Sequence, residues 1–373
     1  MNDFDRNIYC LLGLPFDAVD MAGAVRRVRE AAGRRTPCFL STPNLNFLIA
    51  CQTDAEFRDS VINSNLNIAD GMPLVWIARL LGIPIRERVA GSDLFEQLRK
   101  GTSAQLSVYF FGGMEGVAKE ACRRLNAKSS GLVCAGHETP GFGSIEDMSG
   151  DESIGKINAS GADFLVVSLG AKKGQAWIEH NRARISVPVI SHLGAVVNFV
   201  AGTVSRAPRW MQQVGLEWVW RIMEERGLWR RYFNDLLALL RLLATRVIPY
   251  ALFLRCQPVS QSELAAATVE IREREDACVI YCQGAWSAQN IDRLRSSFKQ
   301  AAARSCDIEL NLEQVTYVDS AFIGLVMLLY KHQQKLGKRL VITGLSKRIE
   351  KIFRWNGAAF LYGMPAPIDE SDA

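Results

Sequence analysis

The chain has 373 residues, a length that suggests two domains or slightly more. Hydrophobic residues make up 49% and charged residues 22%, a balance that supports a sizeable buried core and excludes long disordered stretches. The net charge of +5 is mild, so we expect no wholesale binding of nucleic acid, although the charge leaves room for one local basic patch.

The nine cysteines are scattered, show no zinc-ligand spacing and are odd in number. We therefore expect free thiols in a reducing cytosol and no bound metal. The first residues, MNDFDRNIYCLLGLP, are acidic and contain only a very short apolar run, which is not typical of a signal peptide.

Residues 1–203 alternate between strand-like and helix-like segments. We expect strands at 38–42, 65–70, 106–113, 163–170 and 188–194, and helices at 44–62, from Pro73 onward and at 115–126. Buried strands that alternate with helices predict a Rossmann-like α/β domain with a mostly parallel sheet. In such a sheet, ligands bind at the carboxyl ends of the strands.

Residues 204–256 differ in composition and are expected to form a basic, Trp/Arg-rich amphipathic appendage. Within 236–254, eleven Leu, Ile, Val and Phe residues would favour insertion across a bilayer by about 3–7 kcal/mol, but two Arg would cost about 5–7 kcal/mol. A helix that lies on an anionic membrane surface is therefore favoured over one that spans the membrane. A core helix pair or an oligomer surface remains the alternative.

Residues 257–264 are polar and predict a linker to a second, small α/β domain at 265–373. In that domain we expect strands at 278–284, 307–312 and 339–343, and helices at 288–304, 320–336 and 347–355.

Asp70 and Gly71 lie within NLNIADGMPLVWIARLLG, where a strand is expected to end and a helix to begin. Asp70 alone would be read as an N-cap, because aspartate is common ahead of a helix that starts with proline. The neighbouring strand, however, ends in STPNLNF, and a second carboxylate, Asp93, follows in RVAGSDL. Polar side chains that converge on one sheet edge indicate a functional site.

Three motifs together resemble the WecG/TagA/CpsF family of bacterial glycosyltransferases. They are T-P-N at 42–44, A-D-G at 69–71 and R-A-P-R-W-M-Q-Q-V-G-L-E-W at 206–218, and the resemblance covers about the first 235 residues. It implies transfer of a sugar from a nucleotide-diphosphate donor, often UDP-N-acetylmannosamine, to a polyprenyl-diphosphate-linked sugar. It also implies that Asp70 is the catalytic base, that Thr42 and Asn44 line the sugar site, and that the Arg-rich segment closes over the donor.

This chemistry agrees with the residue types. Inverting transfer needs one carboxylate to accept the proton of the acceptor hydroxyl, and the departing diphosphate needs cations or backbone N–H groups. We expect neither a metal nor another cofactor to be required. The candidate substrate-binding residues are Thr42, Asn44, Gly71, Arg88, Asp93, Gly112, Gly113, Gln175, Arg206, Arg209, Arg221, Arg230 and Arg231. A plain turn is the alternative reading of the Gly112-Gly113 pair.

The sequence departs from the family at two places. Where members carry Gly-x-Pro-x-Gln-Glu, this chain has GAKKGQAW, with Lys172 for the proline and Gly174-Gln175 for Gln-Glu. Where the family tends to have Gly-Gly-x-Phe-Asp, the chain has GAVVNF, with Asn198 for the aspartate. Both changes put N-acetylmannosamine in doubt as the sugar. His192 is interpreted as a satisfied core residue rather than an acid or ligand.

NLEQVTYVDSAFIGLVMLL at 311–329 resembles the STAS domain of anti-sigma-factor antagonists and sulfate transporters. The resemblance makes Ser320 a candidate regulatory site for phosphorylation by a partner kinase, because a phosphate there would meet the helix dipole beside Asp319. A helix cap or an unphosphorylated docking module is the alternative.

Two hypotheses of different classes follow. The first is a glycosyltransferase on the cytoplasmic face of the bacterial inner membrane, or in the cytoplasm, that acts in surface or exopolysaccharide synthesis. Its expected partners are the donor, the lipid-linked acceptor, an anionic membrane and a protein bound by the STAS domain, and a homo-oligomer is compatible. The second is a catalytically degenerate scaffold that binds lipid-linked sugar or partner proteins. A Rossmann oxidoreductase is disfavoured, because no G-x-G-x-x-G follows the first strand.

Overall fold

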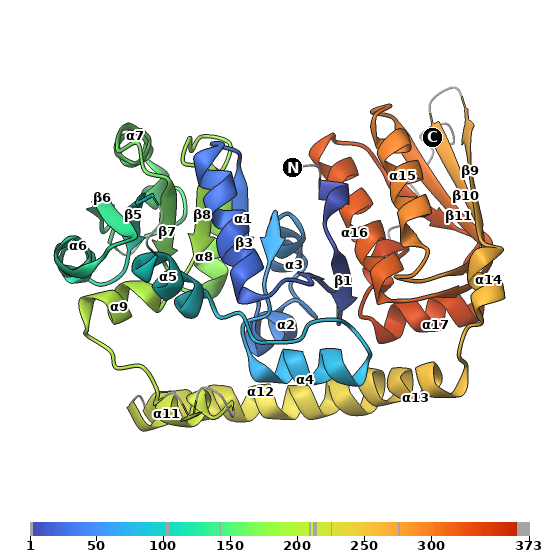
Figure 1. Ribbon diagram of the computed structural model, residues 1–373, viewed down its shortest axis with the longest axis horizontal. Helices are drawn as coiled ribbons and strands as arrows, with labels where there is room; N and C mark the ends of the chain where they lie inside the picture. The colour runs from blue at the N-terminus through green and yellow to red at the C-terminus, as the bar shows by residue number, and fades with distance from the viewer. Residues whose placement is uncertain are drawn as a thin grey trace, which may run out of the picture. The chain divides into compact units, whose positions relative to one another are not determined.

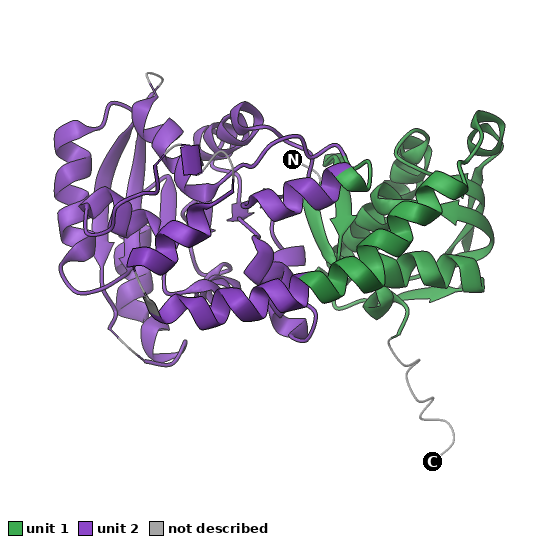
Figure 2. Cartoon of the chain, turned by 90° about the horizontal axis from the view of Figure 1, so that it is seen from below, with its two compact units in different colours: residues 1–16, 80–83, 240–373 green, residues 17–79, 84–239 purple. Residues whose placement is uncertain are grey.

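The computed structural model describes residues 3–101, 104–141, 143–208, 210–211, 215–224, 226–274 and 277–363. The chain divides into two compact units (Figure 2). Unit 2 comprises residues 17–79 and 84–239, and unit 1 comprises residues 1–16, 80–83 and 240–373. This division differs from the boundaries expected from the sequence, because residues 1–16 and 240–256 group with the C-terminal residues.

Unit 2 contains a six-stranded parallel sheet with the order β4-β3-β8-β7-β5-β6 (Figure 1). The strands are β3 (Cys38–Ser41), β4 (Leu66–Asn67), β5 (Leu106–Gly112), β6 (Leu132–Glu138), β7 (Phe164–Ser168) and β8 (Val189–His192). The predicted α/β fold with a mostly parallel sheet is therefore confirmed. The carboxyl ends of β3, β4, β7 and β8 lie along one edge, where the polar motifs of the sequence were expected to meet.

Helices cover both faces of this sheet, and the two cores follow from alternation along the strands. Val108 and Phe110 of β5 face one hydrophobic cluster, whereas Tyr109 and Phe111 face the other. The helices of the unit are α1 (Met21–Gly33), α2 (Leu45–Ala50), α3 (Ala55–Ile62), α4 (Met72–Leu80), α5 (Gly91–Lys100), α6 (Val117–Lys128), α7 (Asp151–Ala159), α8 (Ala171–Asn181), α9 (Val196–Ala201) and α11 (Glu217–Glu224), with short 3-10 turns at Asp147–Ser149 and Arg226–Leu228.

The single helix expected at 44–62 is instead two helices. α2 ends at Ala50 and α3 begins at Ala55, and each has its own N-cap. The Asn44 side chain accepts a hydrogen bond from the Phe47 N–H, and the Asp54 side chain accepts one from the Phe57 N–H. Asn and Asp side chains accept hydrogen bonds from backbone N–H groups and so favour helix starts. A helix predicted from apolar periodicity can therefore be divided in two at such a residue.

Unit 1 contains a four-stranded sheet with the order β12-β11-β10-β9, in which only the β9–β10 pairing is antiparallel. Its strands are β9 (Thr268–Glu273), β10 (Ala277–Trp286), β11 (Asp307–Val318) and β12 (Leu340–Thr343). Its helices are α13 (Ile248–Cys256), α14 (Gln261–Ala265), α15 (Ile291–Ala302), α16 (Ser320–Lys335) and α17 (Lys347–Trp355), with a 3-10 turn at Ala359–Leu361. The expected linker at 257–264 is partly helical, because Ser260 and Glu263 form a capping box at the start of α14.

The N-terminal segment packs on the C-terminal residues of unit 1. It contains a 3-10 turn (Asp3–Asp5) and the strand pair β1 (Ile8–Leu11) and β2 (Leu14–Asp17). The fully buried Lys331 ammonium lies 2.9 Å from the Asp3 carboxylate. Burial opposes ionisation of Asp3, yet Lys331 and Arg6 hold the pKa of its carboxyl at about 2. A buried lysine is destabilising unless it is paired with an opposite charge. Asp3 therefore stabilises the burial of Lys331 in α16, the helix that begins at Ser320.

Residues 229–256 form one long helix, in which α12 (Trp229–Leu242) and α13 are joined by a π-helical turn at Leu243–Val247. It is long and apolar enough to cross a membrane, judged by length and composition alone, and 22% of its most apolar window is buried. About half of the surface of several large apolar side chains is exposed along it: Trp229, Phe233, Leu236, Leu237, Leu240, Ile248 and Leu252.

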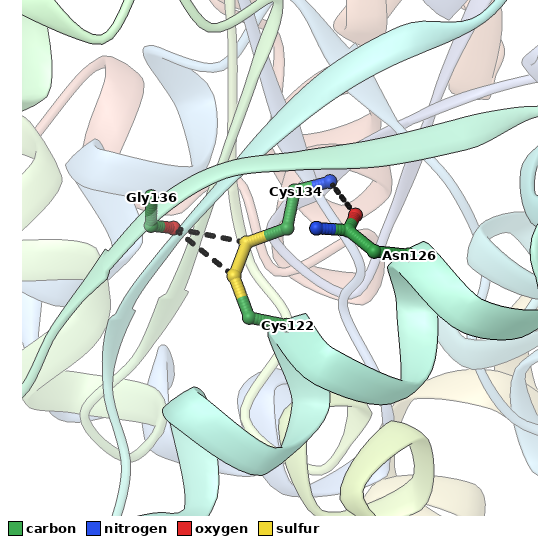
Figure 3. The surroundings of a disulfide bond; sticks show 4 residues. All are labelled: Cys122, Asn126, Cys134 and Gly136. Atoms are coloured by element: carbon green, nitrogen blue, oxygen red, sulfur yellow. Dashed lines mark hydrogen bonds between the residues drawn. A yellow bond between two sulfur atoms is a disulfide. The ribbon is translucent and has the colours of Figure 1, made fainter.

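One pair of cysteines contradicts the expectation of free thiols throughout. Cys122 of α6 and Cys134 of β6 form a disulfide, with Cα atoms 5.2 Å apart (Figure 3). The two cysteines pair because α6 packs on β6 and brings their side chains together. They are twelve positions apart in the sequence, and that spacing alone does not indicate a disulfide. The Asn126 side chain holds this end of the strand by accepting a hydrogen bond from the Cys134 N–H at 2.7 Å.

Gly324 of α16 provides a test of how the N-terminal segment is held. A Cβ built on Gly324 would lie 2.8 Å from the Ile8 carbonyl oxygen, so β1 approaches the helix only because this residue has no side chain. We expect Gly324→Ala to lower the free energy of unfolding of unit 1 by about 1–3 kcal/mol. Hydrogen–deuterium exchange of the unit 1 peptides at increasing denaturant concentration would measure the loss.

Gly155→Ala in α7 is the matched control, because a Cβ there meets no atom within 4 Å. Alanine should stabilise that helix by up to about 1 kcal/mol. If both variants gained stability, β1 would not be closely packed on α16.

Candidate active site

Asp70 follows β4 at the carboxyl edge of the parallel sheet, beside the end of β3. Its N–H donates to the Pro43 carbonyl at 3.0 Å, which ties the two strand ends together. Gly71 has a φ of +150°, and a Cβ built on it would lie 4.0 Å from the Asn44 Cβ. The structure therefore brings Asn44, Asp70 and Gly71 together, as the motif spacing predicted. Thr42, nearly buried, packs within the same edge against Gly91.

The Asp70 carboxylate contacts the start of α5, which is not the helix that directly follows Asp70 in the sequence. Its Oδ2 accepts a hydrogen bond from the Gly91 N–H at 3.3 Å, at the first residue of α5. Burial raises the pKa of Asp70 to about 6, with a smaller rise from Glu217, while Arg88 and Arg221 lower it. A carboxyl with a pKa near neutrality can accept a proton and later release it, which is the property of a general base.

An ion cluster lies next to Asp70. Arg88 contacts Glu217 at 2.6 Å and Asp93 at 2.7 Å through its two terminal nitrogens. Arg206 contacts the other oxygen of Asp93 at 2.5 Å. Glu217 and Arg206 belong to the basic segment that follows the sheet domain, whereas Arg88 and Asp93 belong to the domain itself. The cluster therefore fastens that segment over the edge that carries Asp70.

Further contacts hold the same segment. A Cβ built on Gly215 would lie within 3.2 Å of Met72 and Trp76 side-chain atoms of α4. The buried Asp235 of α12 interacts with the Asn46 side chain of α2. Both contacts are made to helices that begin at the Asp70 edge, which strengthens the placement of the segment.

A cavity of about 600 Å³ opens between α9 and α11. Asn198, Trp220 and Arg221 line it together with Glu217 of the ion cluster. The remaining lining residues are Ala195, Phe199, Thr203, Val204, Ser205, Ala207, Glu224 and Leu228. An indole face and an exposed guanidinium in one cavity suit a flat ring joined to an anionic group.

Gln175 and His192 lie deeper under the edge. Gln175 is buried, and its Nε2 donates to the Ser41 Oγ at 2.8 Å. His192 ends β8, and burial lowers its pKa to about 4, so the ring is neutral at pH 7. The interpretation of His192 as a satisfied core residue is wrong in one respect, because its buried Nε2 has no hydrogen-bond partner among the described residues.

Gly174 explains one departure from the family pattern. A Cβ built on Gly174 would overlap the His192 ring, so the glycine is what makes room for this imidazole. The two residues are eighteen positions apart in the sequence, and no local pattern links them.

The other candidates have different surroundings. The Gly113 N–H donates to the Ser168 carbonyl of β7 at 2.9 Å, and a Cβ on Gly112 would lie 2.7 Å from that same oxygen, so this pair fits β5 against β7. In α12, Arg230 lies 5.6 Å from the Trp229 ring centroid and Arg231 lies 4.0 Å from Asp235. Arg209 is outside the described residues.

Ser320 of unit 1 is the first residue of α16 and is nearly buried, with 6% of its surface exposed. The preceding Asp319 is the N-cap, and its carboxylate accepts hydrogen bonds from the Ala321 and Phe322 N–H groups. Little of the Ser320 surface is therefore exposed in this structure.

Sequence reasoning missed Glu217 and Trp220 as site residues. Both lie in the motif at 206–218 or directly after it, so an acidic residue and an aromatic in an otherwise basic segment were the available signal. Among the described residues, no group of three or more His, Cys, Asp or Glu side chains could hold a metal ion.

Comparison with known proteins gives the class of the protein. Residues 9–251, more than half of the chain, match a family described as "Glycosyl transferase WecG/TagA/CpsF family". The chain is a glycosyltransferase, and it belongs to the WecG/TagA/CpsF family. Residues 269–361 match a model described as "Mlab, STAS domain", so the predicted fusion is confirmed.

Curated relatives carry one name, N-acetylglucosaminyldiphosphoundecaprenol N-acetyl-beta-D-mannosaminyltransferase. The protein of Bacillus spizizenii is 28% identical over 197 residues, which cover 52% of this chain and 75% of that protein. The protein of Staphylococcus aureus strain MW2 is 22% identical over 224 residues, with coverage of 59% and 85%. The phosphorylated Bacillus cell fate determinant SpoIIAA, a solved structure, is 21% identical, with coverage of 29% of this chain and 96% of that one, and a TM-score of 0.23.

The Gly174–His192 fit is open to a double-mutant test. We expect Gly174→Ala to destabilise unit 2 by about 1–3 kcal/mol, because the buried ring cannot move aside freely. In a His192→Ala background the same change should cost nothing, since the obstructing ring is gone. Urea unfolding of the four proteins would give the coupling energy between the two sites. Equal losses in both backgrounds would mean that the two residues do not share this space.

Proposed function

We propose that this glycosyltransferase moves a sugar, with inversion, from a nucleotide-diphosphate donor to a polyprenyl-diphosphate-linked sugar, with Asp70 as the general base. The observation that carries the proposal is the Asp70 carboxyl itself, which lies at the carboxyl edge of the parallel sheet with a pKa raised to about 6. The acceptor class is supported by the name of the curated relatives, which use an undecaprenol-linked N-acetylglucosaminyl diphosphate. UDP is the expected donor nucleotide.

In this mechanism, the acceptor hydroxyl attacks the anomeric carbon of the donor while Asp70 accepts its proton. The bond between the anomeric carbon and the diphosphate oxygen breaks, and its electron pair leaves with the diphosphate. Arg221 lines the adjacent cavity and would stabilise that charge. Arg206 and Arg88 serve mainly to position the segment, because both are already paired with carboxylates.

The cavity between α9 and α11 is the proposed donor site. Trp220 would pack against the nucleobase, and Arg221 would contact the diphosphate. Asn198 lines the same cavity. The neutral His192, six residues earlier in the sequence, ends β8 at the carboxyl edge of the sheet. Because Asn198 differs from the family pattern, the sugar is left open.

The long helix at 229–256 is proposed to lie on the cytoplasmic face of an anionic membrane. Its exposed apolar side chains would enter the acyl boundary, and its five arginines would meet lipid phosphates. A spanning orientation is disfavoured because Tyr250, 2% exposed, packs near Trp355 of α17 at 5.9 Å between ring centroids. If the helix crossed the bilayer, Tyr250 would lose its contact with Trp355 of unit 1.

Replacement of Asp70 by asparagine tests the catalytic role. Asparagine can still accept the Gly91 hydrogen bond, so the melting temperature should hardly change. Loss of the proton acceptor should lower turnover by about 10²–10⁴-fold, with little change in donor affinity. The measurement is transfer from UDP-sugars to a polyprenyl-diphosphate sugar in detergent.

Asp54→Asn is the matched control, because Asp54 also accepts a backbone N–H at a helix start, in α3. Its turnover should stay near the wild-type value. Near-wild-type turnover of Asp70→Asn would overturn the assignment, and Asp93 would then be the next candidate.

The pH dependence of kcat/KM should show the ionisation of Asp70 in the free enzyme. Asp70 must be deprotonated to act, so kcat/KM should fall as the pH drops through about 6. Glu217→Gln should lower the pKa of Asp70 and move this acid limb to lower pH, because Glu217 raises that pKa. Arg88→Met should move it to higher pH, because Arg88 lowers that pKa. Shifts in the same direction would show that another group controls the limb.

A further inference from the structure

One carboxylate in the cavity between α9 and α11 has no role in the proposed transfer. Two glutamates line this cavity, and Glu217 pairs with Arg88 at 2.6 Å. Glu224, the last residue of α11, is exposed in the cavity wall and makes no ion pair with any residue that the structure describes. On the basis of the donor site proposed above, we propose that Glu224 binds the ribose of the donor nucleotide through its 2′- and 3′-hydroxyls.

Helical spacing places Glu224 next to both side chains that would hold the nucleotide. Trp220, Arg221 and Glu224 follow Glu217 by three, four and seven residues, so all four share the face of α11 that lines the cavity. Side chains on a helix lean toward its N-terminus, so Glu224 leans over the turn that carries Trp220 and Arg221. The ribose joins the base to the diphosphate. A base on Trp220 and a diphosphate on Arg221 therefore bring the ribose beside Glu224.

The direction of α11 agrees with this order of groups. Besides burial and Arg88, the groups that shift the pKa of Asp70 include Glu217 and Arg221, so this part of the helix is close to the proposed base. Glu224 lies about 10 Å from Glu217 along the helix axis. Transfer requires the anomeric carbon at Asp70, so the nucleoside end of the donor would extend toward Glu224.

A carboxylate suits a ribose and does not suit a phosphate. Its two oxygens can each accept a hydrogen bond from one of two neighbouring hydroxyls, and an acidic side chain binds ribose in this way in dinucleotide-binding folds. Its charge repels a diphosphate, so Glu224 would weaken a cavity that bound phosphate alone. A nucleoside diphosphate carries hydroxyls beside its anion and can use Glu224 and Arg221 together.

The test compares the full-length wild type with Glu224→Ala by isothermal titration calorimetry with UDP, 2′-deoxy-UDP and inorganic pyrophosphate. Glu56→Ala is the matched control, because Glu56 is an exposed glutamate of α3 that does not line the cavity. We expect the wild type and the control to bind UDP about tenfold more tightly than 2′-deoxy-UDP, since a site that pairs with a hydroxyl rejects the analogue without it. Glu224→Ala should bind the two nucleotides about equally.

Pyrophosphate separates a ribose contact from a general effect of charge. It has no ribose, so it should bind Glu224→Ala at least as tightly as it binds the wild type, because a repulsive charge is gone. Equal weakening of UDP and pyrophosphate binding in Glu224→Ala would overturn the ribose contact. An unchanged preference for UDP over 2′-deoxy-UDP in that variant would overturn it as well.

Arg221→Gln distinguishes a failure of the ribose contact from a failure of the donor site. Arg221 would hold the diphosphate, so this variant should bind both UDP and pyrophosphate more weakly than the wild type. If it does so while Glu224→Ala keeps the wild-type preference, the donor site stands and the ribose contact is wrong. If the wild type binds neither UDP nor pyrophosphate, both the donor site and the ribose contact are wrong.

Discussion

The ion cluster around Arg88 is the interaction on which the candidate active site depends. Its guanidinium joins Asp93 of the sheet domain to Glu217 of the basic segment, and Arg206 closes the group through the second oxygen of Asp93. These partly buried, hydrogen-bonded charges are strong only when all the partners are present, since removal of one leaves the others uncompensated. The same charges tune Asp70, with Glu217 raising its pKa and Arg88 lowering it. The attachment of the segment and the pKa of Asp70 therefore depend on the same charges.

The first residues of the chain pack within unit 1, on the helix α16. Asp3 neutralises the buried Lys331, and the Ile8 carbonyl lies against Gly324 in α16. The STAS domain thus depends on residues that precede the glycosyltransferase domain in the sequence. Ser320 begins the same helix and is nearly buried.

The long helix at 229–256 contributes residues to both units, through a polar contact in unit 2 and aromatic contacts in unit 1. In unit 2, Asp235 fixes α12 to α2 beside the Asn44 cap. In unit 1, Tyr250 and Phe253 of α13 pack among aromatic rings of α17 and β11. The apolar side chains that remain exposed along it, with the arginines beside them, give the helix an amphipathic surface suited to a membrane interface.

The sequence by itself determined the parallel α/β fold, the STAS domain and the grouping of Thr42, Asn44 and Asp70, because hydrophobic periodicity and strand-end motifs are local patterns. It also gave the basic character of the segment that carries Arg206 and Arg221. Only the tertiary structure decided which charges pair, that Cys122 meets Cys134, that Gly174 makes room for His192 and that Asp3 meets Lys331. These contacts join residues from 12 to 328 positions apart, and their geometry is set by how helices pack on sheets rather than by any pattern along the chain.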